Sequence, residues 1–192
     1  MKKQLIVILA IMLTLPEIAY AHTIAGDNGF LSGLNHPVFG LDHLLAMLSV
    51  GILSARIGGK SIWKIPAIFV AIMLLGGILS MNGIHIISVE LGITLSIIVL
   101  GIAIASAKKL PNFIAMYLVG IFAIFHGHAH GTEMPHLAQP ILYALGFIAG
   151  TAIIHIAGII IALALQKLKS GQQTLKLVGA GIAGVGFYLL LI

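Results

Sequence analysis

Long apolar segments alternate with short polar connections along most of the chain. A helix needs about 20 apolar residues to cross a bilayer core of about 30 Å. Six segments come close to this length or exceed it, at residues 37–56, 62–81, 84–106, 111–128, 138–166 and 174–192. The pattern predicts an all-α membrane protein, a six-transmembrane-helix bundle that remains after removal of an N-terminal signal peptide.

The first 21 residues have the pattern of a signal peptide. Lys2 and Lys3 precede an apolar run at 5–15, and the sequence Ala-Tyr-Ala at 19–21 is typical of a cleavage site. We therefore predict a signal peptide over residues 1–21. The alternative is a first helix that is not cleaved.

Basic residues predict the orientation of the remaining domain, residues 22–192. Lys and Arg collect on the cytoplasmic side of membrane proteins. In this chain they flank the first, third and fifth connections between apolar segments, and the second and fourth connections carry none. We therefore expect a multi-pass protein of the bacterial inner membrane, with both mature termini outside. The basic residues that define this pattern are Arg56, Lys60, Lys64, Lys108, Lys109, Lys167, Lys169 and Lys176.

Composition narrows the possible chemistry. The chain is 60% hydrophobic and 8% charged, so we expect a lipid bilayer as its partner. Its net charge of +5 is explained by basic residues that set its orientation in the membrane, so we expect no nucleic acid as a partner. The absence of cysteine excludes disulfides, thiolate metal sites and thiol catalysis. No P-loop motif is present, so we expect no ATPase in this chain. Glycine-rich helix faces would permit a homo-oligomer.

The first group of ionisable residues within the apolar pattern comprises His36, Asp42 and His43. Such residues are costly in a membrane and by default mark a functional site. If a helix begins at Pro37, His36 and His43 are seven positions apart and share one face. The alternative is that Asp42 is a helix-start acid and His43 is its hydrogen-bonded neighbour.

A second group follows at the end of the fourth apolar segment. In a regular helix His126 and His130 would share a face, and His128 would point away. The interleaved glycines and a following proline instead favour an unwound end, which could turn several imidazoles toward one point. The alternative is an exposed loop that binds metal weakly. The group comprises His126, His128, His130, Glu133 and His136.

Three further residues are candidates on separate grounds. Glu90 is costly in an apolar helix unless it is paired, with His43 or His126 as the expected partner, although a purely structural hydrogen bond is the alternative. His155 lies midway along the fifth segment, either as a core residue or on an ion path. His22 could chelate through its α-amine and imidazole if the signal peptide is cleaved.

Imidazoles and carboxylates without thiolates are the ligand set of a borderline divalent metal ion. The residue pattern thus indicates a metal-ion path that opens to the outside. A rival from another class is an intramembrane zinc hydrolase, with His36, His43 and His126 as ligands and Glu90 as base. A metal sensor without transport is a third hypothesis, and its weakness is the lack of a sizeable soluble domain.

Two sequence motifs resemble those of the HupE/UreJ family of nickel permeases. The first is HPVFGLDHLLAM at 36–47, followed by Val50-Gly51, and the second is FHGHAHG at 125–131, followed by Glu133 and Pro135. The resemblance implies a six-helix permease without a prosthetic group, which carries Ni²⁺, with Co²⁺ as a possible substrate, to metalloenzymes such as hydrogenase or urease. It implies metal handling by His36, Asp42, His43, His126, His128, His130 and Glu133.

Overall fold

The computed structural model describes residues 29–108, 110–133 and 139–192, and the side chain of Glu133 is not among its described parts. The predicted signal peptide, His22 and His136 lie outside the described residues. Every regular element of the described part is a helix, which confirms the all-α fold class. The helices are α2 (Gly29–Phe39), α3 (Leu41–Ile57), α4 (Ser61–Met81), α5 (Val89–Ala105), α6 (Asn112–Glu133), α7 (Pro140–Gln166) and α8 (Gly171–Leu191).

Several of these helices are suited to a bilayer. Four of them, α4, α6, α7 and α8, are long and apolar enough to cross a membrane. A fifth span is possible if α2 and α3 count as one, although their axes differ by 84°. Helix α5 is apolar but only 17 residues long. The chain is therefore a multi-pass membrane protein, and the count of six spans stays a prediction.

The start of the first predicted helix is wrong. Pro37 lies near the end of α2, and the chain breaks at Gly40, which has an extended conformation with φ −89° and ψ 114°. A Cβ atom at Gly40 would lie 2.9 Å from Oδ1 of Asp42 and 3.1 Å from Nδ1 of His43, so glycine leaves room for both side chains at this bend. His36 and His43 consequently lie on different helices rather than on one face.

Other boundaries also shift for local reasons. Helix α5 begins at Val89 rather than near residue 84, because Gly83 (φ 75°) and Ser88 (φ 58°) have left-handed backbone conformations in the preceding connection. Helix α6 continues without a break to Glu133, beyond the predicted end at 128.

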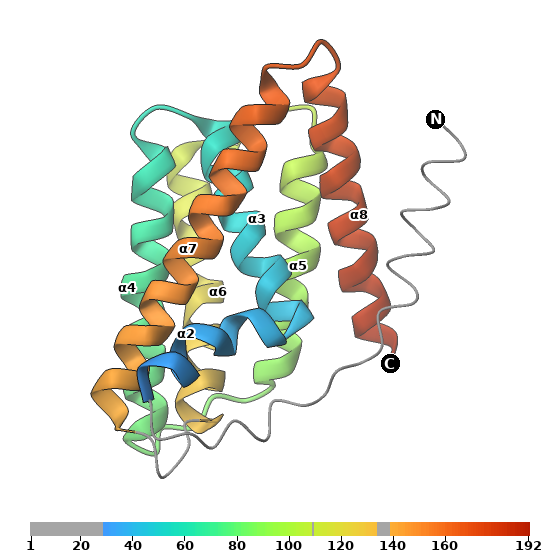
Figure 1. Ribbon diagram of the computed structural model, residues 1–192. Coiled ribbons are helices and arrows are strands. Elements are labelled where there is room, and N and C mark those ends of the chain that lie inside the picture. The colour runs from blue at the N-terminus through green and yellow to red at the C-terminus, as the bar shows by residue number, and fades with distance from the viewer. Residues whose placement is uncertain (1–28, 109, 134–138) are drawn as a thin grey trace.

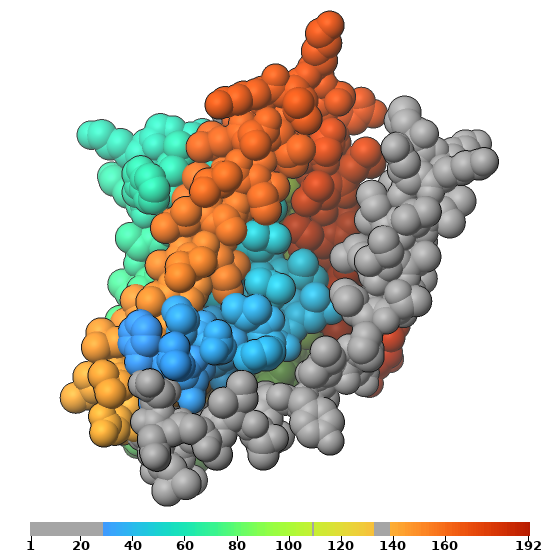
Figure 2. Space-filling view, in the orientation of Figure 1, coloured from blue at the N-terminus to red at the C-terminus, as the bar shows by residue number. Residues whose placement is uncertain are grey.

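The helices form a bundle around α3 (Figure 1). Helix α4 packs against α6 and α5 against α8, and α7 packs against both α2 and α3. From Leu45 to Arg56 every residue of α3 except Leu48 is buried. Helix α2 lies across one end of the bundle, here called the α2 end, together with the start of α5 and the end of α6 (Figure 1). Figure 2 shows α7 crossing the viewed face diagonally with α2 against it, so only part of α3 reaches this surface.

Glycines allow neighbouring backbones to touch. A Cβ atom would lie 1.8 Å from the Met73 carbonyl oxygen at Gly127, and 2.0 Å from the Tyr143 carbonyl oxygen at Gly33. At Gly51 it would lie 2.2 Å from the carbonyl oxygen of His155. The pairs α4–α6, α2–α7 and α3–α7 are thus in backbone contact, as small residues permit in membrane bundles.

Arg56 links α3 to α5 at the opposite end of the bundle. Its guanidinium donates to the carbonyl oxygen of Ala103 at 3.0 Å and also to those of Ile104 and Ser106. These carbonyls belong to the last residues of α5 and to Ser106, which caps it, and they have no hydrogen-bond partner within the helix. Arg56 is 5% exposed, so the buried cation joins α3 to the C-terminus of α5, where the helix dipole favours it.

Candidate metal-ion site

Four histidines from three helices form a continuous row inside the α2 end of the bundle. The ring centroids of His36 and His130 are 4.8 Å apart, those of His130 and His43 4.4 Å, and those of His43 and His126 5.1 Å. We call these four residues the histidine row. The row joins the two sequence motifs, because His36 and His43 come from α2 and α3 and the other two come from α6.

The histidine row runs from a partly exposed residue to a fully buried one. His36 has intermediate exposure, whereas His43 is 7%, His130 5% and His126 0% exposed. Aromatic rings of α7 flank the outer part, with the Phe147 centroid 4.1 Å from His130 and the Tyr143 centroid 5.9 Å from His36. The row therefore leads from a partly exposed imidazole to one that is buried in the interior of the bundle.

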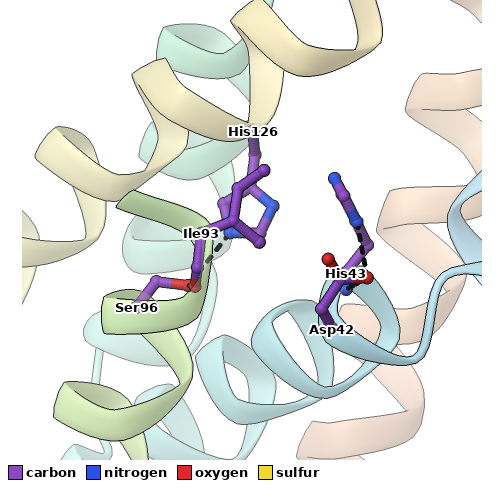
Figure 3. A network of polar contacts seen from close by, with 5 residues as sticks. All are labelled: Asp42, His43, Ile93, Ser96 and His126. Atoms are coloured by element: carbon purple, nitrogen blue, oxygen red, sulfur yellow. Dashed lines mark hydrogen bonds and ion pairs between the residues drawn. The ribbon is translucent and has the colours of Figure 1, made fainter. Parts of the chain in front are cut away.

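Asp42 orients the His43 ring. Its Oδ1 accepts hydrogen bonds from the backbone N–H of His43 at 2.8 Å and from Nδ1 of the ring at 2.9 Å (Figure 3). Asp42 thus lies in the first turn of α3 and is hydrogen-bonded to His43, which agrees with the alternative that Asp42 is a helix-start acid. Metal-binding histidines make the same type of contact. One ring nitrogen binds the metal, and the other usually donates a hydrogen bond to a carboxylate or a backbone carbonyl. The geometry therefore fits both roles at once.

His126 is held from the other side by α5. Its Nε2 lies 3.0 Å from Oγ of Ser96, and this hydroxyl donates to the carbonyl oxygen of Ile93 at 2.6 Å. The rings of His126 and His43 meet nearly at a right angle, with 88° between their planes. Figure 3 shows the two histidines on facing helices, with Ser96 on the side of His126 away from His43 and Asp42 beside His43.

Phe69 of α4 lies between the histidine row and His155. Its ring centroid is 5.5 Å from that of His126 and 5.1 Å from that of His155. His155 is 1% exposed, and neither of its ring nitrogens has a hydrogen-bond partner in the described part of the chain. A buried imidazole without a partner is costly, which favours a role beyond packing.

His128 points away from the histidine row, as a regular helix requires. Its Nε2 lies 2.8 Å from the carbonyl oxygen of Ile84 and 3.2 Å from the backbone nitrogen of Ile86. The ring therefore holds the connection between α4 and α5.

The expected unwinding around His126 to His130 is wrong, because α6 is continuous there. Glycines 127 and 131 serve a different purpose from the predicted one. A Cβ atom at Gly131 would lie 2.7 Å from the carbonyl oxygen of Gly77, and the approach at Gly127 is closer still. Both glycines let α6 approach the backbone of α4, so this part of α6 is closely packed rather than frayed.

Glu90 is less deeply placed than predicted. A helix from residue 84 would have put it in the outer half of the membrane, about 9 Å below Ile84. The observed α5 begins at Val89, and Glu90 is an exposed residue of its first turn. Glu133 ends α6. Both acids therefore belong to helix ends that lie at the α2 end of the bundle (Figure 1).

The described residues contain no group of three or more His, Asp or Glu side chains arranged to hold a metal ion together. The imidazoles instead lie one after another. Such an arrangement offers successive pairs of nitrogen ligands, which is compatible with passage rather than with permanent binding.

Sequence reasoning missed Ser96 and Phe69. Ser96 carried a usable signal, since it is a hydroxyl in an otherwise apolar helix and such groups find hydrogen-bond partners in a membrane bundle. Phe69 carried none, because an aromatic residue in an apolar segment is ordinary core material. Its place between two histidines became visible only from the packing of α4.

Comparison with known proteins agrees with the motif resemblance. The family model described as HupE / UreJ protein matches residues 9–189. Among curated proteins, Protein HupE of Rhizobium leguminosarum bv. viciae is 43% identical over 178 residues, which cover 93% of this chain and 93% of that protein. No solved structure gave a significant match.

Proposed function

The chain belongs to the HupE/UreJ family, whose members are metal permeases rather than enzymes, and from this premise we propose that it carries Ni²⁺ or Co²⁺ inward across the bacterial inner membrane. The ion is a transported substrate, and we propose no prosthetic group. Nitrogen and oxygen ligands suit both metals, so the preference between them is determined by comparing Ni²⁺ and Co²⁺ uptake.

The observation that carries this proposal is the histidine row. Metal–nitrogen bonds of about 2 Å require two ligating nitrogens to lie within about 4 Å of each other. Neighbouring rings of the row have centroids 4.4 to 5.1 Å apart, which lets adjacent imidazoles hold one ion between them. An ion can then leave one pair as it joins the next.

Acids support the entrance in this proposal. Asp42 beside His43, and the helix-end residues Glu90 and Glu133, would make the potential at the α2 end attractive to a cation. The hydrated ion would first meet His36, the partly exposed member of the row. His128 holds the adjoining connection and would contribute to capture there.

In this proposal the path continues inward beyond His126. Beyond it we place His155 as the next ligand, reached past the ring of Phe69 that contacts both histidines. His22, outside the described residues, would add an outer chelating group if the signal peptide is cleaved.

The membrane topology of the proposal has six spans, with α2 and α3 together forming the first and α5 forming the third. It places the α2 end and both mature termini outside. The support is that the connections with Arg56 and Lys60, with Lys108, and with Lys167 all lie at the opposite end (Figure 1). The inside-negative potential then favours inward movement of a divalent cation.

The downstream consumer in this proposal is the maturation of a nickel enzyme such as a hydrogenase or a urease. The alternative function of an intramembrane zinc hydrolase does not fit this chain. It needed Glu90 as a buried base, but Glu90 is exposed, and the family is one of transporters.

Flux through the purified full chain in lipid vesicles tests the function. Uptake of Ni²⁺, Co²⁺, Zn²⁺ and Mn²⁺ is measured with and without a proton gradient, for the wild type, His43→Ala and a matched control, His85→Ala. His85 is exposed in the connection between α4 and α5 and is not a member of the histidine row. We expect saturable Ni²⁺ or Co²⁺ uptake that His43→Ala abolishes and His85→Ala retains. Uptake that is absent in the wild type, or unchanged in His43→Ala, would refute the proposal.

A further inference from the structure

Ser96 is a buried hydroxyl in the middle of α5 that contacts the innermost member of the histidine row. Both Ser96 and His126 are 0% exposed. The serine Oγ donates to the carbonyl oxygen of Ile93 at 2.6 Å and lies 3.0 Å from Nε2 of His126. The contact is therefore a buried hydrogen bond between Ser96 of α5, a helix outside the two motifs, and His126 of the histidine row.

The hydrogen-bond inventory fixes the direction of this contact. A serine hydroxyl has one proton, and a carbonyl oxygen can only accept. The short contact with Ile93 uses that proton, so Oγ of Ser96 must accept from an N–H at Nε2 of His126. A neutral imidazole has one proton, and its other nitrogen, Nδ1, then carries a lone pair.

The opposite assignment is unfavourable at two places. It would set two oxygen lone pairs against each other at 2.6 Å between Ser96 and Ile93. It would also bury an N–H at Nδ1 of His126, and Nδ1 has no hydrogen-bond partner in the described part of the chain. A buried donor without an acceptor is destabilising, because it loses its hydrogen bond to water and gains none in return.

We propose that Ser96 is a positioning residue, which locks His126 in the Nε2–H tautomer so that Nδ1 is the nitrogen offered to the transported ion. Figure 3 shows Nδ1 on the side of the ring that faces His43. His43 donates from Nδ1 to Asp42, so it offers the other nitrogen, Nε2. The two facing rings thus bind through different atoms, each fixed by its own oxygen partner.

This inference rests on the proposed function, since it assigns a metal role to Nδ1. Partners that orient a metal-binding histidine typically contribute about 10- to 100-fold to metal affinity or activity. Without the hydroxyl, His126 could adopt either tautomer and the ring could turn. We therefore expect Ser96→Ala to raise the KM for the transported ion by about tenfold while the protein still folds.

Two variants separate this role from ordinary packing. Ser96→Thr keeps a hydroxyl that can make the same bond to the helix backbone. Ser54→Ala removes another buried hydroxyl of the same geometry, whose Oγ donates to the carbonyl oxygen of Gly51 at 2.8 Å. Ser54 lies near the other end of α3, remote from the histidine row, so its loss should leave transport unchanged.

The experiment has a spectroscopic part and a flux part, both on the purified full chain. Imidazole ¹⁵N chemical shifts, with His126→Asn to identify the signal, report which nitrogen of His126 carries the proton without any metal. We expect Nε2–H in the wild type, in Ser96→Thr and in Ser54→Ala, and a mixture or Nδ1–H in Ser96→Ala. A wild-type proton on Nδ1, or an unchanged tautomer in Ser96→Ala, would overturn the assignment.

The flux part uses Ni²⁺ and Co²⁺ with the same variants in vesicles. A higher KM in Ser96→Ala and wild-type values in Ser54→Ala would support the positioning role. Equal KM values in the wild type and Ser96→Ala would refute it while leaving the transport function intact. Absent saturable uptake in the wild type would instead overturn the transport function, and with it the metal role of Nδ1.

Discussion

His130 of α6 and His43 of α3 meet edge to face, with ring centroids 4.4 Å apart and 61° between their planes. This contact joins the two sequence motifs inside the bundle. His130 also contacts His36 at 4.8 Å, which makes it the link between the entrance and the interior. A break at His130 should therefore divide the path in two.

We expect His130→Ala to reduce Ni²⁺ or Co²⁺ uptake by at least about tenfold, because the ion loses the ligand between His36 and His43. The measurement is initial uptake rate in vesicles at matched protein levels. His85→Ala, which removes an exposed histidine outside the row, should retain uptake. Equal rates in His130→Ala and the wild type would show that the ion does not follow this row.

His128 should behave differently from His130. Its Nε2 either donates to the carbonyl oxygen of Ile84 or accepts from the backbone N–H of Ile86, and each of these bonds holds the connection between α4 and α5. His128→Ala should therefore speed amide hydrogen exchange in this connection. Uptake should fall less than in His130→Ala, because the ring lies outside the histidine row. Hydrogen exchange followed by mass spectrometry checks the first point and vesicle flux the second. A slower exchange, or a larger uptake defect than in His130→Ala, would contradict this division of roles.

Gly127→Ala should destabilise the bundle. The added Cβ would lie 1.8 Å from the Met73 carbonyl oxygen, so α4 and α6 would have to separate. Overpacking of this kind typically costs about 1–3 kcal/mol. Gly181→Ala is the matched control, since nothing lies within 4 Å of its Cβ position. Thermal unfolding in detergent should give a lower midpoint for Gly127→Ala and an equal or higher one for Gly181→Ala, where alanine improves helix propensity.

Arg56→Met should also lower stability. The change leaves the carbonyl oxygens of Ala103, Ile104 and Ser106 without their buried donor, at a cost of about 1–3 kcal/mol. Lys60→Met, which removes an exposed cation from the next connection, is the control. The unfolding midpoint of Arg56→Met should fall below that of Lys60→Met. Similar midpoints would mean that these hydrogen bonds add little.

The sequence predicted the helical class correctly, and it marked the four residues of the histidine row as candidates for a physical reason. Ionisable groups are so costly in an apolar chain that His36, His43, His126 and His130 are visible without any structure. Periodicity showed how a regular helix would separate His128 from His126 and His130, but we expected the helix to unwind there, and α6 is instead continuous.

What the sequence did not predict depends on contacts between helices. Gly127 signalled flexibility by composition, yet its place against Met73 makes it a packing residue. Gly33 belongs to α2, a helix that the apolar pattern did not indicate because Ser32 and Asn35 interrupt it. Such roles are set by the facing backbone, which local sequence does not encode.

The backbone contacts of α7 have a mechanical consequence for both ends of the path. Tyr143 of α7 touches Gly33 of the helix that carries His36, and the carbonyl of His155 touches Gly51 of the helix that carries His43. His155 is thus part of α7, whereas His36 is on α2, whose backbone touches α7 at Gly33. A tilt of α7 would move the His155 ring with it and would press on α2 and α3 at these two contacts.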